Sequence, residues 1–410
     1  MPDRLIARRE FVRSSVGTLG AIAAAASLAR AAGGPGPSPG APAAPRGPNT
    51  AFTGEQLDQI AFPMGGLGAG MMCLEGPGAL TNVSIRDRPM LQNQPGLFAA
   101  VSIGGPSKVA RVVEGPVPRW KLYLRRHAAT GSGPLGLGLP RFERAVFRAH
   151  FPFARVELAD PAVPLAARIT AWSPFEPGDA DNSSLPVAGL EYTFTNSGEE
   201  ELDAVFSFNA RNFVPAAMNE WQSGPEPARG SRATPGGFTL YGGAWPSAQQ
   251  EEAWCAFAVD DPAVKVNLAW FRGDWFDPQT MAWRDVEQGA AYDRPVPAEG
   301  RLPTGASLFV PFHVLPGASK TIRLRIAWYA PRSRLRDVAP PPGDAAPPSA
   351  YYQPWYAGRF ASVDELSAYW RDQYADLRRR SERFSDCFLD STLPPEAVEA
   401  AAANLSILKS

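Results

Sequence analysis

The sequence contains little cysteine and little histidine, two residue types that often bind transition metals. Its 410 residues include three cysteines and three histidines. Cys73, Cys255 and Cys387 show no Cys-x-x-Cys spacing, and the histidines are far apart, so the sequence does not indicate a metal site. We expect the cysteines to be small buried hydrophobic side chains. A Cys73–Cys255 disulfide is the alternative in an oxidising compartment.

The sequence also lacks an excess of charge of either sign. It has 40 Lys and Arg against 41 Asp and Glu, a formal net charge of -1. The basic run Arg378-Arg379-Arg380 is interpreted as the solvated face of a helix. We therefore expect no nucleic-acid partner.

A membrane-spanning helix is not indicated either. The stretch from Val16 to Leu28 is too short and too rich in Ala and Gly to cross ~30 Å of hydrocarbon. It follows Arg8 and Arg9, which fit a twin-arginine export pattern, and precedes the small-x-small site Ala29-Arg30-Ala31.

These features predict a twin-arginine signal peptide over residues 1–31, with no transmembrane span in the mature chain. The mature protein is then expected to be exported, to the periplasm or the extracellular space. Residues 32–50, rich in Gly, Pro and Ala, are expected to form a disordered tether.

Residues 51–336 carry the pattern of an antiparallel β-sandwich. Strand-like runs are joined by short turn sequences, which predict hairpins at 196–198, 260–262 and 316–317. In the last run Ile322, Leu324, Ile326 and Trp328 alternate with Arg323 and Arg325. This alternation predicts a sheet with one solvent-exposed face, and several such hairpins favour two packed sheets.

The period changes after a proline-rich connector, residues 337–361. Ser362-Val363-Asp364-Glu365 is a capping box that begins a helix. Leu366, Trp370, Tyr374, Leu377 and Phe384 then recur at helical spacing. The sequence therefore predicts a long amphipathic linker helix over residues 362–390.

A second helix is predicted to begin in residues 391–410, where Ser391 and Thr392 can cap and Pro394-Pro395 suit the first turn. Its apolar stripe, Val398, Ala401, Leu405 and Leu408, is followed by no Gly or Asn cap. We expect this stripe to face a helical domain missing from the chain, so that residues 393–410 fray without it.

The glycine-rich segment 62–70 is not a phosphate-binding loop. Its glycines do not fit G-x-G-x-x-G, and no Lys-Ser or Lys-Thr follows. It is interpreted as a first strand that packs closely against a neighbour.

This segment, followed by Arg88-Pro89 and residues 98–103, resembles the N-terminal domain of glycoside hydrolase family 116, the bile-acid β-glucosidase or non-lysosomal glucosylceramidase family. Further segments agree in the same order: 172–179 with 182–187, 275–289, 316–317 with 327–329, and 384–406. The resemblance covers about Phe52 to Ser410.

The resemblance implies a two-domain enzyme that hydrolyses β-glycosides with retention and needs no cofactor. The predicted fold class is mainly β, a two-sheet antiparallel β-sandwich followed by a connector helix and the truncated start of an (α/α) barrel domain. In this family the nucleophile and acid/base carboxylates belong to the helical domain, so no residue of this chain inherits a catalytic role. The implied partners are the missing C-terminal helical domain and a carbohydrate or glycolipid substrate.

Candidate sugar or interdomain contacts lie in two loops that combine acids with tryptophan or asparagine. They are Asp179, Asp181, Asn182, Asp274, Trp275 and Trp283, with Asp277 and Asp285 as further carboxylates. The structural alternative is that the acids cap turns and the tryptophans pack an interface. The functional alternative is a free-standing exported carbohydrate-binding or interaction module, with Trp275 and Trp283 as an exposed platform.

Overall fold

The structure, a computed structural model, describes residues 46–85, 95–105, 108–123, 136–214, 229–243, 252–271, 277–300, 302–332 and 353–409. The predicted signal peptide with Arg8 and Arg9 lies outside these residues. No helix in the described ranges is both long enough and apolar enough to cross a membrane.

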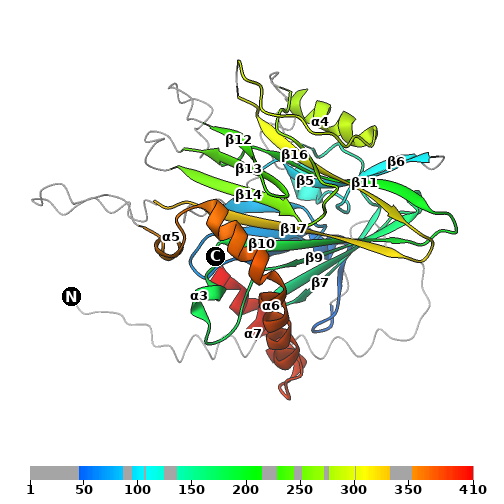
Figure 1. Cartoon of the computed structure of the whole chain (residues 1–410). Helices are drawn as coiled ribbons and strands as arrows, with labels where there is room; N and C mark the ends of the chain where they lie inside the picture. Colours follow the sequence, from blue (N-terminus) through cyan, green and yellow to red (C-terminus); the bar gives the residue numbers. More distant parts are fainter. Residues whose placement is uncertain are drawn as a thin grey trace, which may run out of the picture. The chain divides into compact units, whose positions relative to one another are not determined.

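The described residues form three antiparallel sheets (Figure 1). The nine-stranded sheet has the order β1 (Phe52–Thr53), β7 (Arg144–His150), β8 (Phe153–Ala159), β9 (Leu165–Trp172), β10 (Val187–Asn196), β17 (Ser319–Tyr329), β14 (Ala253–Val259), β13 (Gly237–Gly242) and β12 (Arg229–Thr234). The five-stranded sheet has the order β15 (Lys265–Asn267), β16 (Gly305–Val314), β11 (Leu202–Arg211), β5 (Leu97–Ile103) and β6 (Val109–Val112). The third contains β2 (Ala61–Gly65), β3 (Met71–Glu75) and β4 (Leu80–Ser84). The prediction of a mainly β, antiparallel chain is confirmed.

The two larger sheets share one hydrophobic core. Tyr192 of the nine-stranded sheet contacts Phe206 of the five-stranded sheet, with ring centroids 5.0 Å apart. Phe208 and Phe257 meet in the same way at 5.1 Å. Because these rings project from every second residue, the period-2 pattern in the sequence places them on the inner faces.

Three short connections cross from one large sheet to the other, so the predicted hairpins at 196–198, 260–262 and 316–317 are wrong. They link β10 to β11, β14 to β15 and β16 to β17, and in each case the two strands belong to different sheets. A turn sequence between alternating strands suits strands that pair in one sheet and also strands that stack ~10 Å apart. The buried amide of Asn196 holds the first crossing by donating to the carbonyls of Glu200 and Val314 at 2.7 and 3.1 Å.

The helices lie around the sheets. They are the 3-10 turn η1 (Gly54–Gln59), α2 (Arg119–Tyr123), α3 (Ala180–Ser183), α4 (Asp277–Glu287), α5 (Trp355–Arg359), α6 (Val363–Leu389), α7 (Pro395–Ser406) and the 3-10 turn η4 (Ile407–Lys409). Helix α6 begins where the capping box predicts, since Ser362 Oγ accepts from the Glu365 amide at 3.2 Å.

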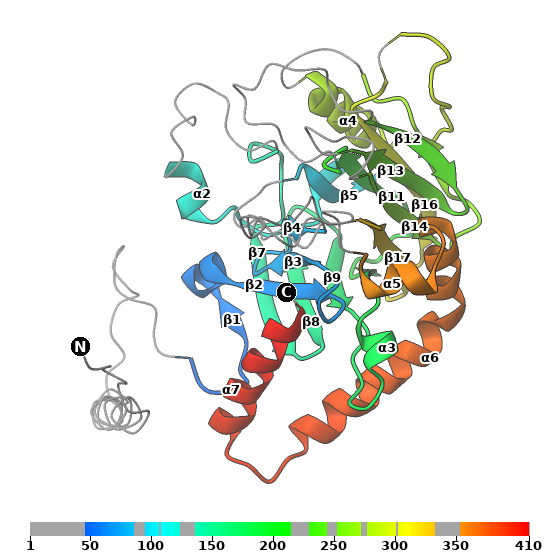
Figure 2. The same cartoon turned by 90° about the vertical axis from the view of Figure 1, so that its left-hand side faces the viewer.

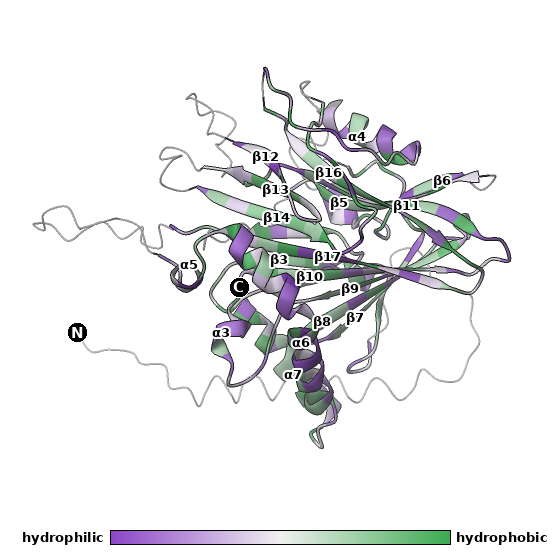
Figure 3. Cartoon of the chain, viewed as in Figure 1, coloured by the Kyte–Doolittle hydropathy of each residue, from purple (hydrophilic) through white to green (hydrophobic). Residues whose placement is uncertain are grey.

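Helix α6 covers part of the outer face of the nine-stranded sheet and crosses β17 and β14 (Figure 1). Its buried side is Leu366, Trp370, Tyr374 and Leu377, at the predicted spacing. Figure 3 shows hydrophilic and hydrophobic bands along this helix. The expectation of a solvent-exposed outer face is therefore wrong where α6 lies, and Arg325 of β17 is buried there.

Helix α7 has partners within this chain, contrary to the expectation that its apolar stripe is left uncovered. Val398 is 3% exposed, and Leu405 packs against the main core. Ala401 and Leu408 of the predicted stripe are instead exposed. Figure 2 shows α7 beside β1. Arg46 and Asn49, from the predicted tether, bind Glu399 of α7.

The glycine-rich segment forms the tight connection from β2 to β3. A Cβ on Gly66 would lie 2.3 Å from the carbonyl oxygen of Ser184. The next amide, of Leu67, donates to the Ser183 carbonyl at 3.0 Å. The glycine therefore permits the backbone to approach the loop that carries the candidate residues Asp179 and Asn182.

Candidate functional site

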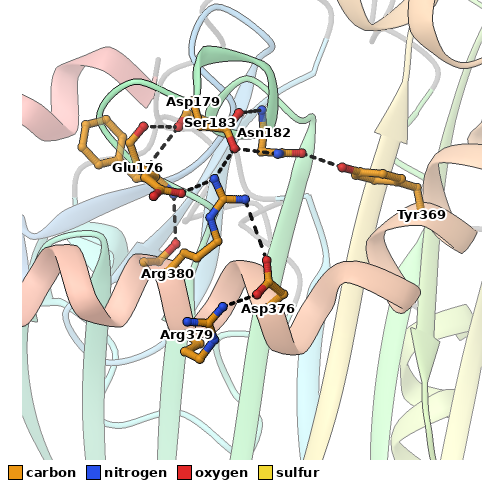
Figure 4. Close-up of polar contacts among 10 residues, drawn as sticks. Glu176, Asp179, Asn182, Ser183, Tyr369, Asp376, Arg379 and Arg380 are labelled. Carbon is orange, nitrogen blue, oxygen red and sulfur yellow. Dashed lines mark hydrogen bonds and ion pairs between the residues drawn. The ribbon is translucent and has the colours of Figure 1, made fainter.

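The loop between β9 and β10, residues 173–186, holds three of the candidate residues. Asp179 caps helix α3: its Oδ1 accepts from the backbone amide of Asn182 at 3.0 Å, and its Oδ2 accepts from the Asn182 side chain at 2.7 Å. We call Glu176, Asp179, Asn182, Tyr369, Asp376 and Arg380 the α3–α6 cluster. Figure 4 shows these side chains facing one another across the loop and α6.

Arg380 of α6 is the centre of this cluster. Its Nη2 forms ion pairs with Glu176 Oε2 and Asp179 Oδ2, and its Nη1 lies 3.8 Å from Asp376 Oδ2. A guanidinium group presents several donors in a fixed plane, so one arginine can hold two carboxylates together. The cluster thereby fixes α6 on the loop.

Two carboxylates close together are the arrangement that glycoside cleavage requires, but Asp179 is not suited to be the general acid of that reaction. Partial burial raises the pKa of Asp179, yet the hydrogen bonds from Asn182 and Arg380 outweigh it and leave the pKa below its ordinary value. A general acid needs a raised pKa to hold its proton near neutral pH. Glu176 shares the same guanidinium. The two carboxylates are therefore suited to binding Arg380.

The other two candidate residues of this loop, Asn182 and Asp181, have different surroundings. Asn182 accepts a hydrogen bond from the hydroxyl of Tyr369 at 2.7 Å, which ties it to α6. Asp181 is exposed, in the first turn of α3, where a carboxylate favours the positive end of the helix dipole. A direct role of either residue in sugar binding stays a prediction.

Trp283 lies far from this loop in the fold, on helix α4. Its side chain is 7% exposed and packs with Val286 against Phe98 and Ala100 of β5. Asp285 of the same helix accepts from the Tyr292 hydroxyl at 2.6 Å. Since a stacking platform needs an accessible ring face, the platform prediction now depends on Trp275.

Asp274 and Trp275 lie outside the described residues, so their prediction stays as it was made. Asp277 is the first residue of α4. The structure thus brings together Asp179 and Asn182, with Asp181 adjacent, and places Trp283 in a separate cluster.

The three consecutive arginines of α6 are not all solvated, contrary to the interpretation from sequence. Arg378 donates to both carboxylate oxygens of Glu191, at 2.7 and 3.0 Å, while Arg380 binds the α3–α6 cluster. Arg379 alone is exposed. Arg378 follows Tyr374 by four residues, so the two lie on the same side of α6. This spacing indicates that Arg378 continues the buried side of the helix.

Glu191 and its partners form a buried polar network under α6. The hydroxyl of Tyr374 donates to Glu191 Oε1 at 3.0 Å and accepts from Trp172 Nε1 at 3.0 Å. Burial raises the pKa of Tyr374, so this hydroxyl stays protonated. The sequence does not predict this network, because Tyr374 and Arg378 follow Glu191 by 183 and 187 residues.

Lys409 is a further residue that the sequence does not single out. Its amino group is fully buried, donates to the carbonyl of Pro174 and lies 5.4 Å from the ring centroid of Phe175. Burial lowers its pKa from 10.5 to about 7.

The sulfur and imidazole groups do not assemble a metal centre within the described residues. There, no group of three or more His, Cys, Asp and Glu side chains could hold a metal ion. All three cysteines are free thiols, Cys73 and Cys255 buried and Cys387 exposed. The expectation of a buried side chain is therefore wrong for Cys387.

The fold is that of a mainly β domain, and the α3–α6 cluster holds helix α6 against its nine-stranded sheet. Its sequence matches the family described as beta-glucosidase 2, glycosyl-hydrolase family 116 N-term, over residues 61–377. The chain belongs to this family of glycosyl-hydrolase family 116 N-terminal domains.

Other comparisons give weaker similarity. No curated protein matches the chain. Among solved structures, a kojibiose phosphorylase-like protein from the human microbiome is 8% identical, with a TM-score of 0.38 over 80% of this chain and 35% of that chain. A polysaccharide lyase is 10% identical, with a TM-score of 0.26 over 70% of this chain and 33% of that chain. The chain thus spans about a third of the length of these two proteins.

Proposed function

We propose that this chain is the N-terminal domain of an exported glycoside hydrolase that cleaves β-linked glucosides, or related xylosides or glucosaminides, with retention of configuration. The observation that carries this proposal is the family match over residues 61–377. In this proposal the two large sheets are the β-sandwich of the family, and residues 391–410 are the beginning of its (α/α) barrel domain.

The proposal places both catalytic carboxylates in a helical domain outside this chain. Retaining hydrolysis needs a nucleophile and an acid/base carboxyl group ~5–5.5 Å apart. In the described residues Glu176 and Asp179 are brought together, and both are bound to Arg380. Their role under this proposal is to hold α6, and through it the next domain, in a fixed position.

The first test is a hydrolysis assay. The purified chain should release no nitrophenol from aryl β-glucosides or aryl β-xylosides. Turnover that survives repurification and disappears in Asp179→Asn or Glu176→Gln would overturn the proposal. Turnover in a longer protein, unchanged by Asp179→Asn, would support it.

The second test is the nucleotide sequence after the codon for Ser410. An open frame that encodes further amphipathic helices supports the two-domain proposal. A stop codon favours the alternative of a free-standing carbohydrate-binding module.

The proposed export depends on the arginine pair in residues 1–31. The pathway that carries folded proteins recognises this pair, so a variant with Arg8→Lys and Arg9→Lys should stay in the cytoplasm. Cell fractionation measures this, with Arg13→Lys as a control that should still be exported. Normal export of the double variant would remove the localisation proposal.

A further inference from the structure

A groove of about 490 Å³ lies between helix α6 and the outer face of the nine-stranded sheet. Five arginines, two glutamates and three threonines line it. Five positive and two negative side chains leave a formal charge of +3 in the lining. The whole chain has a net charge of -1, so this groove is a local concentration of positive charge.

The strand register explains how the arginines come together. Arg148, Arg155, Thr170, Glu191 and Arg323 lie directly opposite one another on five adjacent strands, β7, β8, β9, β10 and β17. All five therefore share one face of the sheet. Arg148 and Arg155 are directly opposite, an arrangement of like charges that destabilises a sheet. The stability of the sheet therefore does not explain why two arginines stand opposite each other here.

The middle of the row is neutralised and fixed. Glu191 is bound by Arg378 through two hydrogen bonds, and Arg378 also pairs with Glu382. The three sheet arginines that line the groove, Arg155, Arg168 and Arg323, are exposed and form no ion pair with any residue that the structure describes. Glu157 lies opposite Arg168 on β8, but the two form no such pair.

The unpaired arginines fall on two sides of the Glu191–Arg378 pair. Arg155 and Arg168 lie on β8 and β9, and Arg323 lies on β17. Between them, the hydroxyls of Thr193 and Thr321 form a hydrogen bond of 2.9 Å. Guanidinium groups bind carboxylate and sulfate oxygens with two parallel hydrogen bonds, and hydroxyls can bond to sugar hydroxyls.

From this geometry we propose that the groove binds an acidic oligosaccharide, with one carboxylate or sulfate group at Arg155 and Arg168 and a second at Arg323. The Glu191–Arg378 pair in the middle separates the two anion positions, so a ligand with two or more charges fits better than one small anion. A concave groove does not suit a flat membrane surface. No aromatic side chain is exposed in its lining for a nucleic-acid base to stack on, because Tyr374 is buried. This proposal does not depend on the proposed hydrolytic activity.

The test is calorimetric titration of the purified chain with size-defined probes at low salt. We expect a hexagalacturonate or a sulfated heparin-type hexasaccharide to bind, and neutral cellohexaose not to bind. Binding should weaken as salt is added, because exposed charges are screened. The variant Arg155→Gln with Arg168→Gln should lose about tenfold or more in affinity, and Arg323→Gln should lose affinity separately.

The matched control is Arg232→Gln, which removes an arginine of the same sheet that is paired with Asp364 outside the groove. Its affinity should equal that of the unchanged chain, and a thermal unfolding curve should show that every variant is folded. The proposal fails if neither acidic hexasaccharide binds, or if the double variant binds them as well as the control. It also fails if inorganic sulfate binds as tightly as the hexasaccharides, or if anionic vesicles or a single-stranded DNA oligonucleotide bind more tightly.

Discussion

Trp172 donates a hydrogen bond from its indole nitrogen to the hydroxyl oxygen of Tyr374 at 3.0 Å, across 202 residues of sequence. The two rings also meet nearly edge to face, with centroids 5.0 Å apart. Trp172 ends β9, and Tyr374 lies in the middle of α6. This contact joins the sheet to the helix at a point where both side chains are buried, so it should contribute measurably to stability.

The first prediction concerns that contact. Tyr374→Phe keeps the ring but leaves Trp172 Nε1 without its acceptor in a buried position. The free energy of unfolding should fall by roughly 1–3 kcal/mol, the cost of an unsatisfied buried donor. Urea denaturation measures it. Tyr369→Phe is the control, because its hydroxyl bonds Asn182 at a partly buried position, and it should cost less.

A second prediction separates two adjacent arginines. Arg378→Ala leaves the buried carboxylate of Glu191 without its two charged hydrogen bonds. The loss should be roughly 2–4 kcal/mol, below the ~3–5 kcal/mol of fully buried pairs because the Arg378 side chain is 26% exposed. Arg379→Ala, at 67% exposure, should change stability by less than about 0.5 kcal/mol. Equal losses in the two variants would contradict the assignment of Arg378 to the buried network.

The glycine turn between β2 and β3 gives a third prediction. Gly66→Ala places a methyl group 2.3 Å from the Ser184 carbonyl oxygen, so the loop must shift. A loss of roughly 1–3 kcal/mol is expected, as for other overpacked positions. Gly358→Ala in α5 meets no atom within 4 Å and should be neutral or stabilise by up to about 1 kcal/mol. Thermal unfolding of both variants compares them directly.

Lys409 gives a prediction about pH. Its pKa is about 7 in the folded chain against 10.5 when exposed, so between these values the unfolded state binds one more proton. The free energy of unfolding should therefore rise with pH across this window, by up to about 1.4 kcal/mol per pH unit. Below pH 7 both states are protonated and this contribution stops changing.

The measurement is a series of denaturation curves between pH 6 and pH 10, the range set by this window. Lys409→Met should lack the rise that the unchanged chain shows. Lys265→Met, at an exposed ion pair with Asp293, should keep it. A rise of the same size in Lys409→Met would mean that another group is responsible.

The docking of α7 gives the last prediction. Val398→Ala removes at most two buried carbon atoms. The free energy of unfolding should fall by roughly 1–2 kcal/mol, at ~0.8 kcal/mol per carbon. Amide hydrogen exchange in residues 395–406 should become faster, while exchange in β10 and β17 stays slow. Leu408→Ala is the control, since Leu408 is 48% exposed. Fast exchange of α7 in the unchanged chain would instead support the fraying expected from sequence.

The sequence predicted those features of the fold that depend on residues close together in the chain. The capping box at Ser362 and the spacing of Leu366, Trp370 and Tyr374 determine where α6 begins and which side it buries, because both depend on residues within one or two turns. The alternation in residues 322–328 likewise gives the inner face of β17 correctly. These signals need no knowledge of the rest of the chain.

The sequence did not predict which segments far apart in the chain lie next to each other. Whether Asn196-Ser197-Gly198 joins neighbours in one sheet or crosses to the other depends on which strands lie beside β10, and these are β9 and β17. In the same way, the run Arg378-Arg379-Arg380 shows charge, while its partners Glu191 and Asp179 lie about 200 residues earlier. The sequence singled out Asp179 as a candidate, but it did not predict that the guanidinium group of Arg380 binds it.

The three crossings between the large sheets also constrain the order in which the chain can fold. Strand β10 ends at Asn196, and its second neighbour, β17, begins at Ser319. During synthesis, β10 therefore keeps an open edge until more than a hundred further residues have been made, and such edges invite pairing with other chains. High contact order of this kind slows folding. A chain interrupted before Ser319 would leave β10 and β14 without the strand that joins them, and aggregation is the expected fate of such a product.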